Sequence, residues 1–588
     1  MSGRGVLRAF ALLLVFTSPL FAQEPSKKPA ETPPAAPPPA SPSEEAYRKL
    51  RGVRTDPPAY VDGLVKFLNE FPRSREADSG AYNLRDAVRR SGNDPQKTRS
   101  LVTKFVDGTA TLPEQMRLRF YSQAVTILLA NDLAPEAESV ALRATPFLNE
   151  KAYVDFDRLR HDRDEEERKR RFPASKSYEF SVAEQTERYH SFAAALHASL
   201  GTSYFKQNKL ELADKAFREA HRIKPDMESA VGIAEVLEKQ NRIPEAFEFM
   251  TFAMLTGRLK PEGIEHFHAL YRKTHNGSLD GVEAYLDSTY RKRDRNPLAV
   301  RKYQPAASRS NRVVLAELIT GGGCIPCIPI DYSFEAALKE YSRRELTLLV
   351  YHMHAPVSDP LSNHSAENRV KYYDVNSAPT AFLDGTKFNN PAAPRTTELA
   401  TSKTQIVHDA LASGIDTRLT TPEMARLDLK TVREGQNVSV RVNADRIKET
   451  FTDVTLHVVL VEEEVSYSGE NGLRFHPMVV RNLARKTPAD NYGFILDPTK
   501  LNTIEYVFDT AKIVQANLLY YDQYPVERKQ ELSARLDKET LDSLTFSFRE
   551  KRNEMDVSKL AVVAFVQDNK TKQILQAAFE RVTTTPAP

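Results

Sequence analysis

The sequence predicts a multidomain protein in which an α-solenoid precedes an α/β domain and a C-terminal β-sandwich. From residue 45 to 300, apolar residues recur at three- and four-residue intervals, which is the period of amphipathic helices. Between residues 311 and 414, apolar β-rich runs alternate with helical patterns. From residue 415 to 588, short strands are separated by turn signals. A chain of 588 residues also exceeds what one hydrophobic core can organise, so several domains are expected.

The first 22 residues have the pattern of a secretory signal peptide. Arg4 and Arg8 give a basic start, a short apolar run follows, and the segment ends on the small residue Ala22. The run is too short for a permanent transmembrane helix, and no later segment is apolar enough for one. We therefore expect an exported protein without a stable transmembrane segment after signal removal; an uncleaved N-terminal anchor is the alternative. Residues 23–44 are rich in proline and are expected to form an extended spacer.

The predicted α-solenoid contains two sequence repeats. In the first copy, apolar residues recur at the spacing of a helix pair: Leu200, Gly201, Tyr204, Ala213, Phe217, Ala220 and Pro225. A weaker copy follows about 33 residues later: Ala234, Leu237, Ala246, Met250 and Ala253. These positions resemble the tetratricopeptide repeat (TPR), whose stacked helix pairs form a concave surface for peptides or other proteins. Helices that merely pack on the next domain are the alternative.

The only two cysteines, Cys324 and Cys327, follow three glycines that are expected to form a flexible rim. A CxxC pair between a strand and a helix suits thiol–disulfide exchange, because the helix N-terminus favours the thiolate of the first cysteine. The second cysteine then resolves the mixed disulfide. We therefore expect Cys324 to be the exposed, attacking cysteine and Cys327 the resolving one. A structural clip is a poorer explanation because so small a loop constrains little chain entropy. A zinc site would need two further ligands, and no histidine has a paired spacing with Cys324.

The α/β domain resembles the thioredoxin fold. The resemblance rests on the CxxC pair, on Glu317 seven residues before the first cysteine, and on the segment VNSAPTAFLDG. It implies that Glu317 is a buried acid beneath the dithiol that relays its proton. It also implies that Pro379 forms a cis-proline loop that faces the dithiol and exposes backbone to a bound peptide. The implied catalytic set is therefore Cys324, Cys327, Glu317 and Pro379, with no cofactor and no metal ion.

The C-terminal part, residues 415–588, is predicted to be a β-sandwich of immunoglobulin-like size with one inserted helix. Together with the α/β domain it resembles a group of exported, outer-membrane-related bacterial proteins. The phrases that carry this resemblance are AELITGGGCIPC, DPLSNHSAENRVKYYDVNSAPTAFLDG and VEEEVSYSGENGLRFHPMVVRN. The resemblance implies a bacterial protein that is periplasmic, outer-membrane associated or secreted.

The charge balance excludes one class of partner. Lysine and arginine total 82 against 79 aspartates and glutamates, which gives no reason to expect a nucleic-acid partner. Two functions fit the remaining features. The first is a thioredoxin-like thiol–disulfide oxidoreductase acting on envelope proteins, with the repeats recruiting protein or peptide substrates. The second is a non-catalytic envelope adaptor that binds proteins through its repeat and β-sandwich domains. The sequence leaves open whether an exchanging dithiol would reduce, oxidise or isomerise.

Overall fold

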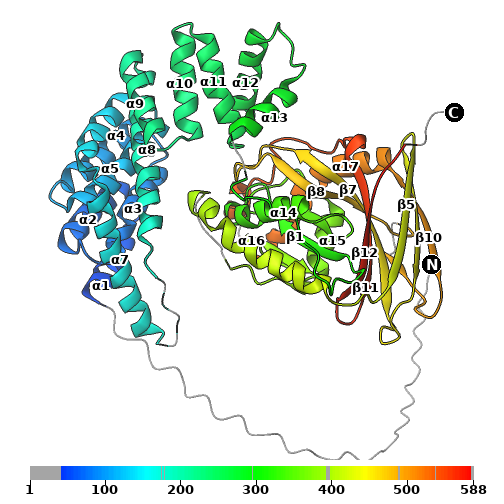
Figure 1. Ribbon diagram of the computed structural model, residues 1–588. Coiled ribbons are helices and arrows are strands. Elements are labelled where there is room, and N and C mark those ends of the chain that lie inside the picture. Colours follow the sequence, from blue (N-terminus) through cyan, green and yellow to red (C-terminus); the bar gives the residue numbers. More distant parts are fainter. Residues whose placement is uncertain are drawn as a thin grey trace, which may run out of the picture.

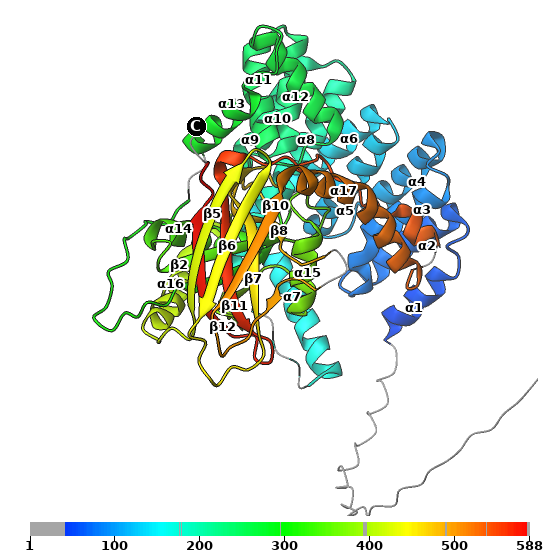
Figure 2. The same ribbon diagram turned by 90° about the vertical axis from the view of Figure 1, so that its right-hand side faces the viewer.

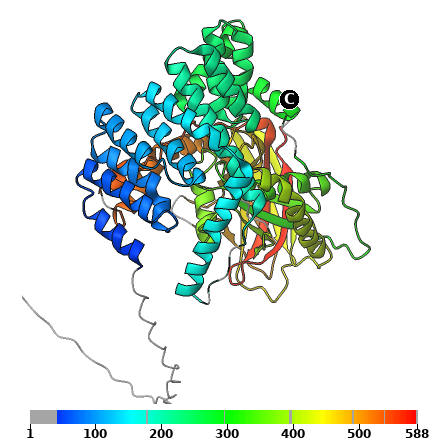
Figure 3. The ribbon, with the colours of Figure 1, turned by 90° about the vertical axis from the view of Figure 1, so that its left-hand side faces the viewer.

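The computed structural model describes residues 41–173, 175, 177, 179–293, 296–391, 397–487, 491–536 and 538–584. The predicted signal peptide and most of the predicted spacer lie outside the described residues. Figure 1 shows a curved row of helices beside a sheet-containing half, and Figure 3 shows the same helices from their own side. The structure thus confirms a helical region followed by a mostly β region. Within the described ranges, no helix combines the length and the apolar character that a membrane span requires.

The helical half begins inside the predicted spacer. Ser41 accepts a hydrogen bond from the backbone N–H of Glu44, and the Glu44 carboxylate accepts one from the N–H of Ser41. This capping box starts the first helix at Pro42. The helices of this half are α1 (Pro42–Arg51), α2 (Pro57–Glu70), α3 (Gly80–Arg90), α4 (Pro95–Gly108), α5 (Glu114–Ala130), α6 (Ala134–Ala144), α7 (Glu150–Arg171), α8 (Val182–Lys206), α9 (Leu210–Ile223), α10 (Met227–Lys239), α11 (Ile243–Leu255), α12 (Pro261–Thr274) and α13 (Val282–Arg293).

The TPR-like repeats correspond to the helix pairs α8–α9 and α10–α11. Phe217 of α9 packs against two glycines on neighbouring helices. A Cβ at Gly201 of α8 would lie 2.7 Å from the Phe217 ring, and one at Gly232 of α10 would lie 2.4 Å from it. Ala213 and Ala220 of α9 are fully buried. Small residues therefore let successive helices approach closely, as the repeat pattern predicts.

The α/β part follows the order β-α-β-α-β-β-α. Its elements are β1 (Val314–Thr320), the short turn η3 (Ile325–Cys327), α14 (Ile328–Glu340), β2 (Leu346–His352), α15 (His364–Tyr372), β3 (Thr380–Leu383), β4 (Thr386–Lys387) and α16 (Thr397–Leu419). Strands β2 and β1 are parallel, whereas β3 is antiparallel to β1 and β4 to β3. Every residue of β1 and β2 is buried, which explains their continuous apolar sequences. Helices α14 and α16 pack against each other.

The C-terminal part contributes strands to two sheets. Its elements are β5 (Arg426–Glu434), β6 (Asn437–Asp445), β7 (Val454–Ser466), β8 (Phe475–Leu483), β9 (Phe494–Ile495), β10 (Asn502–Asp509), α17 (Thr510–Ser533), α18 (Lys538–Ser543), β11 (Leu560–Asp568) and β12 (Ile574–Arg581). Strands β10, β6 and β5 form a three-stranded sheet, seen in front of the larger sheet in Figure 2. The inserted helix α17 starts directly after β10, earlier than the sequence suggests.

The larger sheet crosses the predicted domain boundary at residue 414. Its strand order is β12-β11-β7-β8-β2-β1-β3-β4, with β9 paired to β7. The connection between the two parts is a parallel pairing of β8 with β2 at Val479 and Val350. The α/β part and the C-terminal part therefore share one sheet, and the predicted boundary does not separate two sheets.

Candidate functional site

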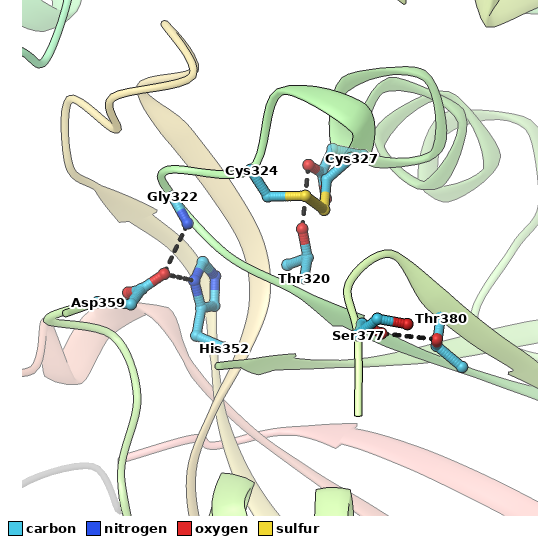
Figure 4. The surroundings of a disulfide bond; sticks show 9 residues. Thr320, Gly322, Cys324, Cys327, His352, Asp359, Ser377 and Thr380 are labelled. Atoms are coloured by element: carbon cyan, nitrogen blue, oxygen red, sulfur yellow. Dashed lines mark hydrogen bonds and ion pairs between the residues drawn. A yellow bond between two sulfur atoms is a disulfide. The ribbon is translucent and has the colours of Figure 1, made fainter. Parts of the chain in front are cut away.

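A disulfide bond between Cys324 and Cys327 joins the end of β1 to the start of α14 (Figure 4). The sulfur atoms are 2.07 Å apart and the Cα atoms 5.3 Å apart. The backbone N–H of Cys324 donates to the carbonyl of Gly321 (2.9 Å), and the N–H of Cys327 donates to the carbonyl of Cys324 (3.1 Å). Both cysteines thus lie at the strand–helix junction, where a helix N-terminus favours a thiolate.

Both cysteines are buried. Cys324 is 3% exposed and Cys327 0% exposed. The prediction of an exposed Cys324 is therefore wrong. The loop before the cysteines is covered by the tip of the β7–β8 hairpin, residues 467–474, here named the cover hairpin. The backbone N–H of Asn471 in this hairpin donates to the carbonyl of Gly322 (2.8 Å). The cover comes from a distant part of the chain, so no local sequence pattern reveals it.

The glycines before the cysteines allow close packing and do not form a flexible rim. A Cβ at Gly321 would lie 2.8 Å from the carbonyl oxygen of Met353. A Cβ at Gly322 would lie 2.8 Å from the ring of Tyr467 in the cover hairpin. Both distances are shorter than an ordinary van der Waals contact. Glycine is therefore required here by the approach of neighbouring segments.

The helical half holds the cover hairpin in place. Arg474 of the hairpin has a fully buried side chain, whose Nε donates to Oδ1 of Asp287 (2.7 Å). Its Nη2 donates to Oε2 of Glu283 (2.7 Å), and both acids lie on α13. A second contact comes from the loop between α11 and α12, where Nε of Arg258 donates to the carbonyl of Glu470 (3.1 Å). Contacts between the two halves of the molecule therefore hold the cover hairpin over the glycine loop that precedes the disulfide.

A buried carboxylate and imidazole support the glycine loop from below. Oδ2 of Asp359 accepts hydrogen bonds from the N–H of Gly322 (2.6 Å) and from Nδ1 of His352 (2.9 Å). Burial alone would raise the pKa of Asp359. The interaction with His352 and the backbone N–H groups of Gly322 and Leu361 outweigh burial and lower this pKa to about 2. Asp359 is therefore an ionised acceptor that fixes both the loop and the imidazole.

Asp331 is the acid nearest in the chain to the cysteines. It lies four residues after Cys327 in α14, one helical turn further on the same face. The hydroxyl of Thr320, which Figure 4 shows directed toward the disulfide, donates to Oδ2 of Asp331 (3.1 Å). Burial raises the pKa of Asp331 to about 7, although the Thr320 hydrogen bond and His352 oppose this shift. The sequence analysis did not identify Asp331 as a candidate site residue. Its spacing of four residues from Cys327, one helical turn, could have indicated a carboxyl group near the disulfide.

Glu317 is buried, and its charge is compensated by the guanidinium of Arg369. This pair lies on the face of the sheet opposite to the Thr320 side chain. The Glu317 carboxylate accepts hydrogen bonds from Nε (2.7 Å) and Nη2 (3.1 Å) of Arg369 in α15. The hydroxyls of Tyr351 and Tyr373 also donate to it. Glu317 and Thr320 are three residues apart in β1, so their side chains project to opposite faces. Within the described residues, no contact joins Glu317 to the disulfide, and its proton-relay role stays a prediction.

The loop with Pro379 precedes β3. The Ala378–Pro379 peptide bond is cis. The hydroxyl of Thr380 donates to the carbonyl of Ser377 (2.8 Å), and Figure 4 includes both residues in the surroundings of the disulfide. The interaction of this loop with a bound peptide stays a prediction.

Replacing Asp331 by asparagine is expected to change how stability depends on pH. The folded protein raises the pKa of this carboxyl from 3.8 to about 7, so between these values it holds a proton that the unfolded chain has lost. The contribution of Asp331 to the free energy of unfolding therefore falls as pH rises from about 4 to about 7. The asparagine of the variant cannot titrate. The Tm difference, Asp331→Asn minus wild type, should thus increase between pH 4 and pH 8 in calorimetry.

The exposed residue Asp428 on β5 offers a matched control for this comparison. Asp428→Asn makes the same substitution at an exposed position, so it reports the effect of the substitution without burial. A flat Tm difference for Asp331→Asn would contradict the raised pKa.

Comparisons with known proteins add little to this description. No protein-family model and no curated protein matches the chain. Among solved structures, the chain is similar to a thermophilic TPR protein from Thermus thermophilus. The match has 15% sequence identity and a TM-score of 0.20, and it covers 39% of this chain and 98% of that chain. A TM-score this low carries no weight, so the TPR-like assignment rests on the helix packing described above.

Proposed function

We propose that this protein is an exported thiol–disulfide exchange protein of the bacterial envelope, with a thioredoxin-like α/β part. The observation that supports the proposal most is the position of the disulfide, between a buried parallel strand and the start of a helix. Asp331 lies one turn further along that helix. The strand order β2-β1-β3-β4, with β2 parallel to β1 and with β3 and β4 antiparallel to their neighbours, also supports the proposal. The helical repeats would recruit the protein substrates.

The exchange reaction balances without a cofactor. In the reduced protein, the thiolate of Cys324 attacks a substrate disulfide, forms a mixed disulfide and releases one substrate thiolate. The thiolate of Cys327 then attacks the sulfur of Cys324, which releases the second substrate thiolate and closes the disulfide seen in the structure. Two electrons pass from the protein to the substrate. The Asp331 carboxylate accepts the thiol proton of Cys327, and the reverse sequence oxidises a substrate dithiol.

Cys324 is 3% exposed, so its surroundings must open before a substrate sulfur can reach it, and in this proposal the part that moves is the cover hairpin, which packs on the nearby Gly322. Its main anchor is the ion pair of Arg474 with Glu283 and Asp287 on α13. A partner that binds the helical half and disturbs α13 would therefore favour the open state. In this proposal the helical half both recruits the substrate and controls access to the dithiol.

The enclosure of the disulfide favours a second candidate function, a non-catalytic adaptor. Cys324 is 3% exposed, and structural disulfides are characteristically buried. In an adaptor, the disulfide would only fasten the loop beneath the cover hairpin. The helical repeats and the β-sandwich would then bind envelope proteins without any exchange of thiols.

Reduction of insulin by dithiothreitol separates the two candidates. An exchange protein should accelerate the precipitation of insulin chains at substoichiometric concentration, and Cys324→Ser should abolish the acceleration. Cys327→Ser, first reduced and then freed of dithiothreitol, should accumulate a mixed disulfide when it is incubated with insulin, because the resolving thiolate is missing. The adduct is measured by intact mass on non-reduced samples.

The double variant Cys324→Ser/Cys327→Ser is the control, since it lacks both thiols and should show neither acceleration nor an adduct. A wild-type rate equal to that of dithiothreitol alone, together with no adduct of Cys327→Ser, would reject the exchange function. The adaptor function would then be retained.

A further inference from the structure

A pocket of about 780 Å³ lies beside the buried Arg369, where the α/β part meets the C-terminal part. It is bounded by α15, by β7, by the end of β8 and the residues that follow it, and by Asn569 in the β11–β12 turn. Figure 2 shows α15 next to β7 and β8, and α15 packs on both β8 and β2. Neither cysteine lines this pocket. Its volume is within the range of small-ligand sites.

The lining of the pocket carries positive charge and no acidic side chain. Lys371 of α15 and Lys486 after β8 both line it, and both are exposed. Within the described residues, no hydrogen bond or ion pair joins either lysine to an acid. The acid one helical turn before Lys371 is Glu367, which already accepts a hydrogen bond from Tyr520 (2.8 Å) and lies 3.9 Å from His364. The two ammonium groups are therefore available to a ligand.

Two further cations stand behind the aromatic walls of the pocket. The guanidinium of Arg485 lies 5.0 Å from the ring centroid of Tyr492, and Nζ of Lys572 lies 5.0 Å from that of Tyr372. Both tyrosines line the pocket. In the part of the chain that the structure describes, neither Arg485 nor Lys572 forms an ion pair with an acid. The positive charge of the lining is thus reinforced from outside it.

The acids nearest to this region are engaged elsewhere. Oδ1 of Asp453 accepts a hydrogen bond from Nδ2 of Asn569 (2.7 Å). Oδ2 of Asp568 accepts from the backbone N–H (2.8 Å) and the hydroxyl (2.6 Å) of Thr571. Neither carboxylate lines the pocket. Four cations without an ion-pair partner therefore face two acids, which leaves the pocket with an excess of positive charge.

The base of the pocket is rigid and carries no negative charge. Arg369 is 1% exposed and is held by Glu317 and by Gln567. His457 is 7% exposed, and its ring stacks on that of Phe565 with centroids 4.8 Å apart. Burial lowers the pKa of His457, and the guanidinium of Arg369 lowers it further, so the ring is neutral. The second effect shows that the potential of Arg369 at the base is positive.

The walls offer an apolar surface and neutral donors. Leu483, Tyr492 and Ile495 provide the apolar and aromatic contacts. Ile495 is 83% exposed, which is unusual for so large an apolar side chain and places it at the rim. The amides of Asn368 and Asn491 can each donate two hydrogen bonds. Apolar walls with a few polar groups of one sign are typical of a site for a charged organic molecule.

We propose that this pocket binds a small organic anion, with Lys371 and Lys486 as counter-ions of its anionic group and Tyr492 and Ile495 against its apolar body. Lysine ammonium groups act as point charges toward carboxylates and phosphates alike. The anionic group therefore has two sources, a carboxylate or a phosphate ester. The enclosed volume favours a free small molecule over a segment of another protein.

The site goes beyond the proposed exchange function, because no cysteine contributes to it. The Cys324→Ser/Cys327→Ser variant should bind the anion as wild type does. Loss of exchange activity and loss of anion binding are therefore separate results.

Calorimetric titration of the purified protein at pH 8 tests the site with phenyl phosphate and benzoate as probes. Phenol has the aromatic body without the charge, and inorganic phosphate has the charge without the body. The better of the two organic anions should bind at least about tenfold more tightly than either phenol or inorganic phosphate. Tighter binding of phenyl phosphate indicates a phosphate ester as the ligand, and tighter binding of benzoate indicates a carboxylate. Raising the salt concentration from about 20 mM to about 300 mM should weaken the binding at least about threefold.

Two changes at exposed positions place the binding in this pocket. Lys371→Gln/Lys486→Gln removes both counter-ions and should weaken binding of the organic anion about tenfold or more. Ile495→Glu adds a negative charge at the rim and should also weaken it, so the test does not depend on one variant. The matched controls Lys430→Gln and Leu501→Glu change exposed residues outside the pocket and should bind as wild type.

Any of three results would overturn the proposal. The first is that neither phenyl phosphate nor benzoate binds at about 10 mM. The second is that phenol binds as tightly as the organic anions, which would show that the positive charge is not used. The third is that Lys371→Gln/Lys486→Gln and Ile495→Glu both bind as wild type, which would place the binding elsewhere.

Discussion

Replacing Arg369 by methionine is expected to lower the free energy of unfolding by about 3–5 kcal/mol. Arg369 and Glu317 are each 1% exposed, and two hydrogen bonds join them. Nη1 of Arg369 also donates to Oε1 of Gln567 on β11 (2.9 Å). Methionine would leave the Glu317 carboxylate in the core without its counter-ion, and it would also break a link between α15, β1 and β11. Urea denaturation followed by circular dichroism measures the loss.

Two further variants separate the buried charge from the lost packing. The double variant Glu317→Gln/Arg369→Met removes the orphaned carboxylate and should recover part of the loss. Arg426→Met breaks an ion pair with Asp445 on an exposed strand, and surface pairs of this kind contribute about 0–1 kcal/mol. If Arg369→Met cost no more than Arg426→Met, the buried pair would not be important for stability.

Replacing Gly257 by alanine is expected to raise the rate of disulfide reduction by at least about tenfold. Gly257 follows α11 with a φ of +68°, and an added Cβ would lie 2.0 Å from the carbonyl oxygen of Gly469 in the cover hairpin. The clashing atoms belong to the backbone, which cannot avoid the clash by a rotamer change as a long side chain can. Either the loop after α11 or the cover hairpin must move. A loss of about 1.4 kcal/mol in the closed state makes the open state tenfold more populated.

The rate is measured by reduction with dithiothreitol in native buffer, alkylation of the released thiols and mass spectrometry. Gly277→Ala is a matched control, because Gly277 has a φ of +80° and nothing within 4 Å of an added Cβ. It shares the backbone strain without the contact. Equal reduction rates for Gly257→Ala and Gly277→Ala would show that the helical half does not hold the cover hairpin closed.

The strands around the cysteines can be predicted from the sequence because their cause is local. Buried parallel strands are covered on both faces, so β1 and β2 appear as uninterrupted apolar runs. The TPR-like pairs are predictable for the same reason, since small residues at fixed spacing allow helices to pack. The burial of Glu317 also follows from its place in such a run. The face to which Glu317 projects depends on which helix covers each side of the sheet, and no residue near it specifies that.

The position of the cover hairpin over the glycine loop cannot be predicted from the sequence, because the contacts that hold it join distant segments. Arg474 is held by Glu283 and Asp287, which lie 191 and 187 residues earlier in the chain. An ion pair across that separation leaves no periodic pattern in either segment. Asp331 could have been noticed in the sequence, because it lies only four residues after Cys327. Its raised pKa could not, because that shift is caused by burial in the folded protein. The sequence shows the acid, and the structure shows why its proton is held.

The pairing of β8 with β2 also determines how this protein can be recombined with others. In a chain where the α/β part were a self-contained module, its sheet would end in strands built to face water. Here β2 has a partner on each side, and its sequence LTLLVYH carries no charge along the edge that β8 covers. Transferred alone, this part would present a bare apolar edge, which promotes pairing with other chains. The two C-terminal parts are therefore expected to fold, and to tolerate transfer to another chain, only as one unit.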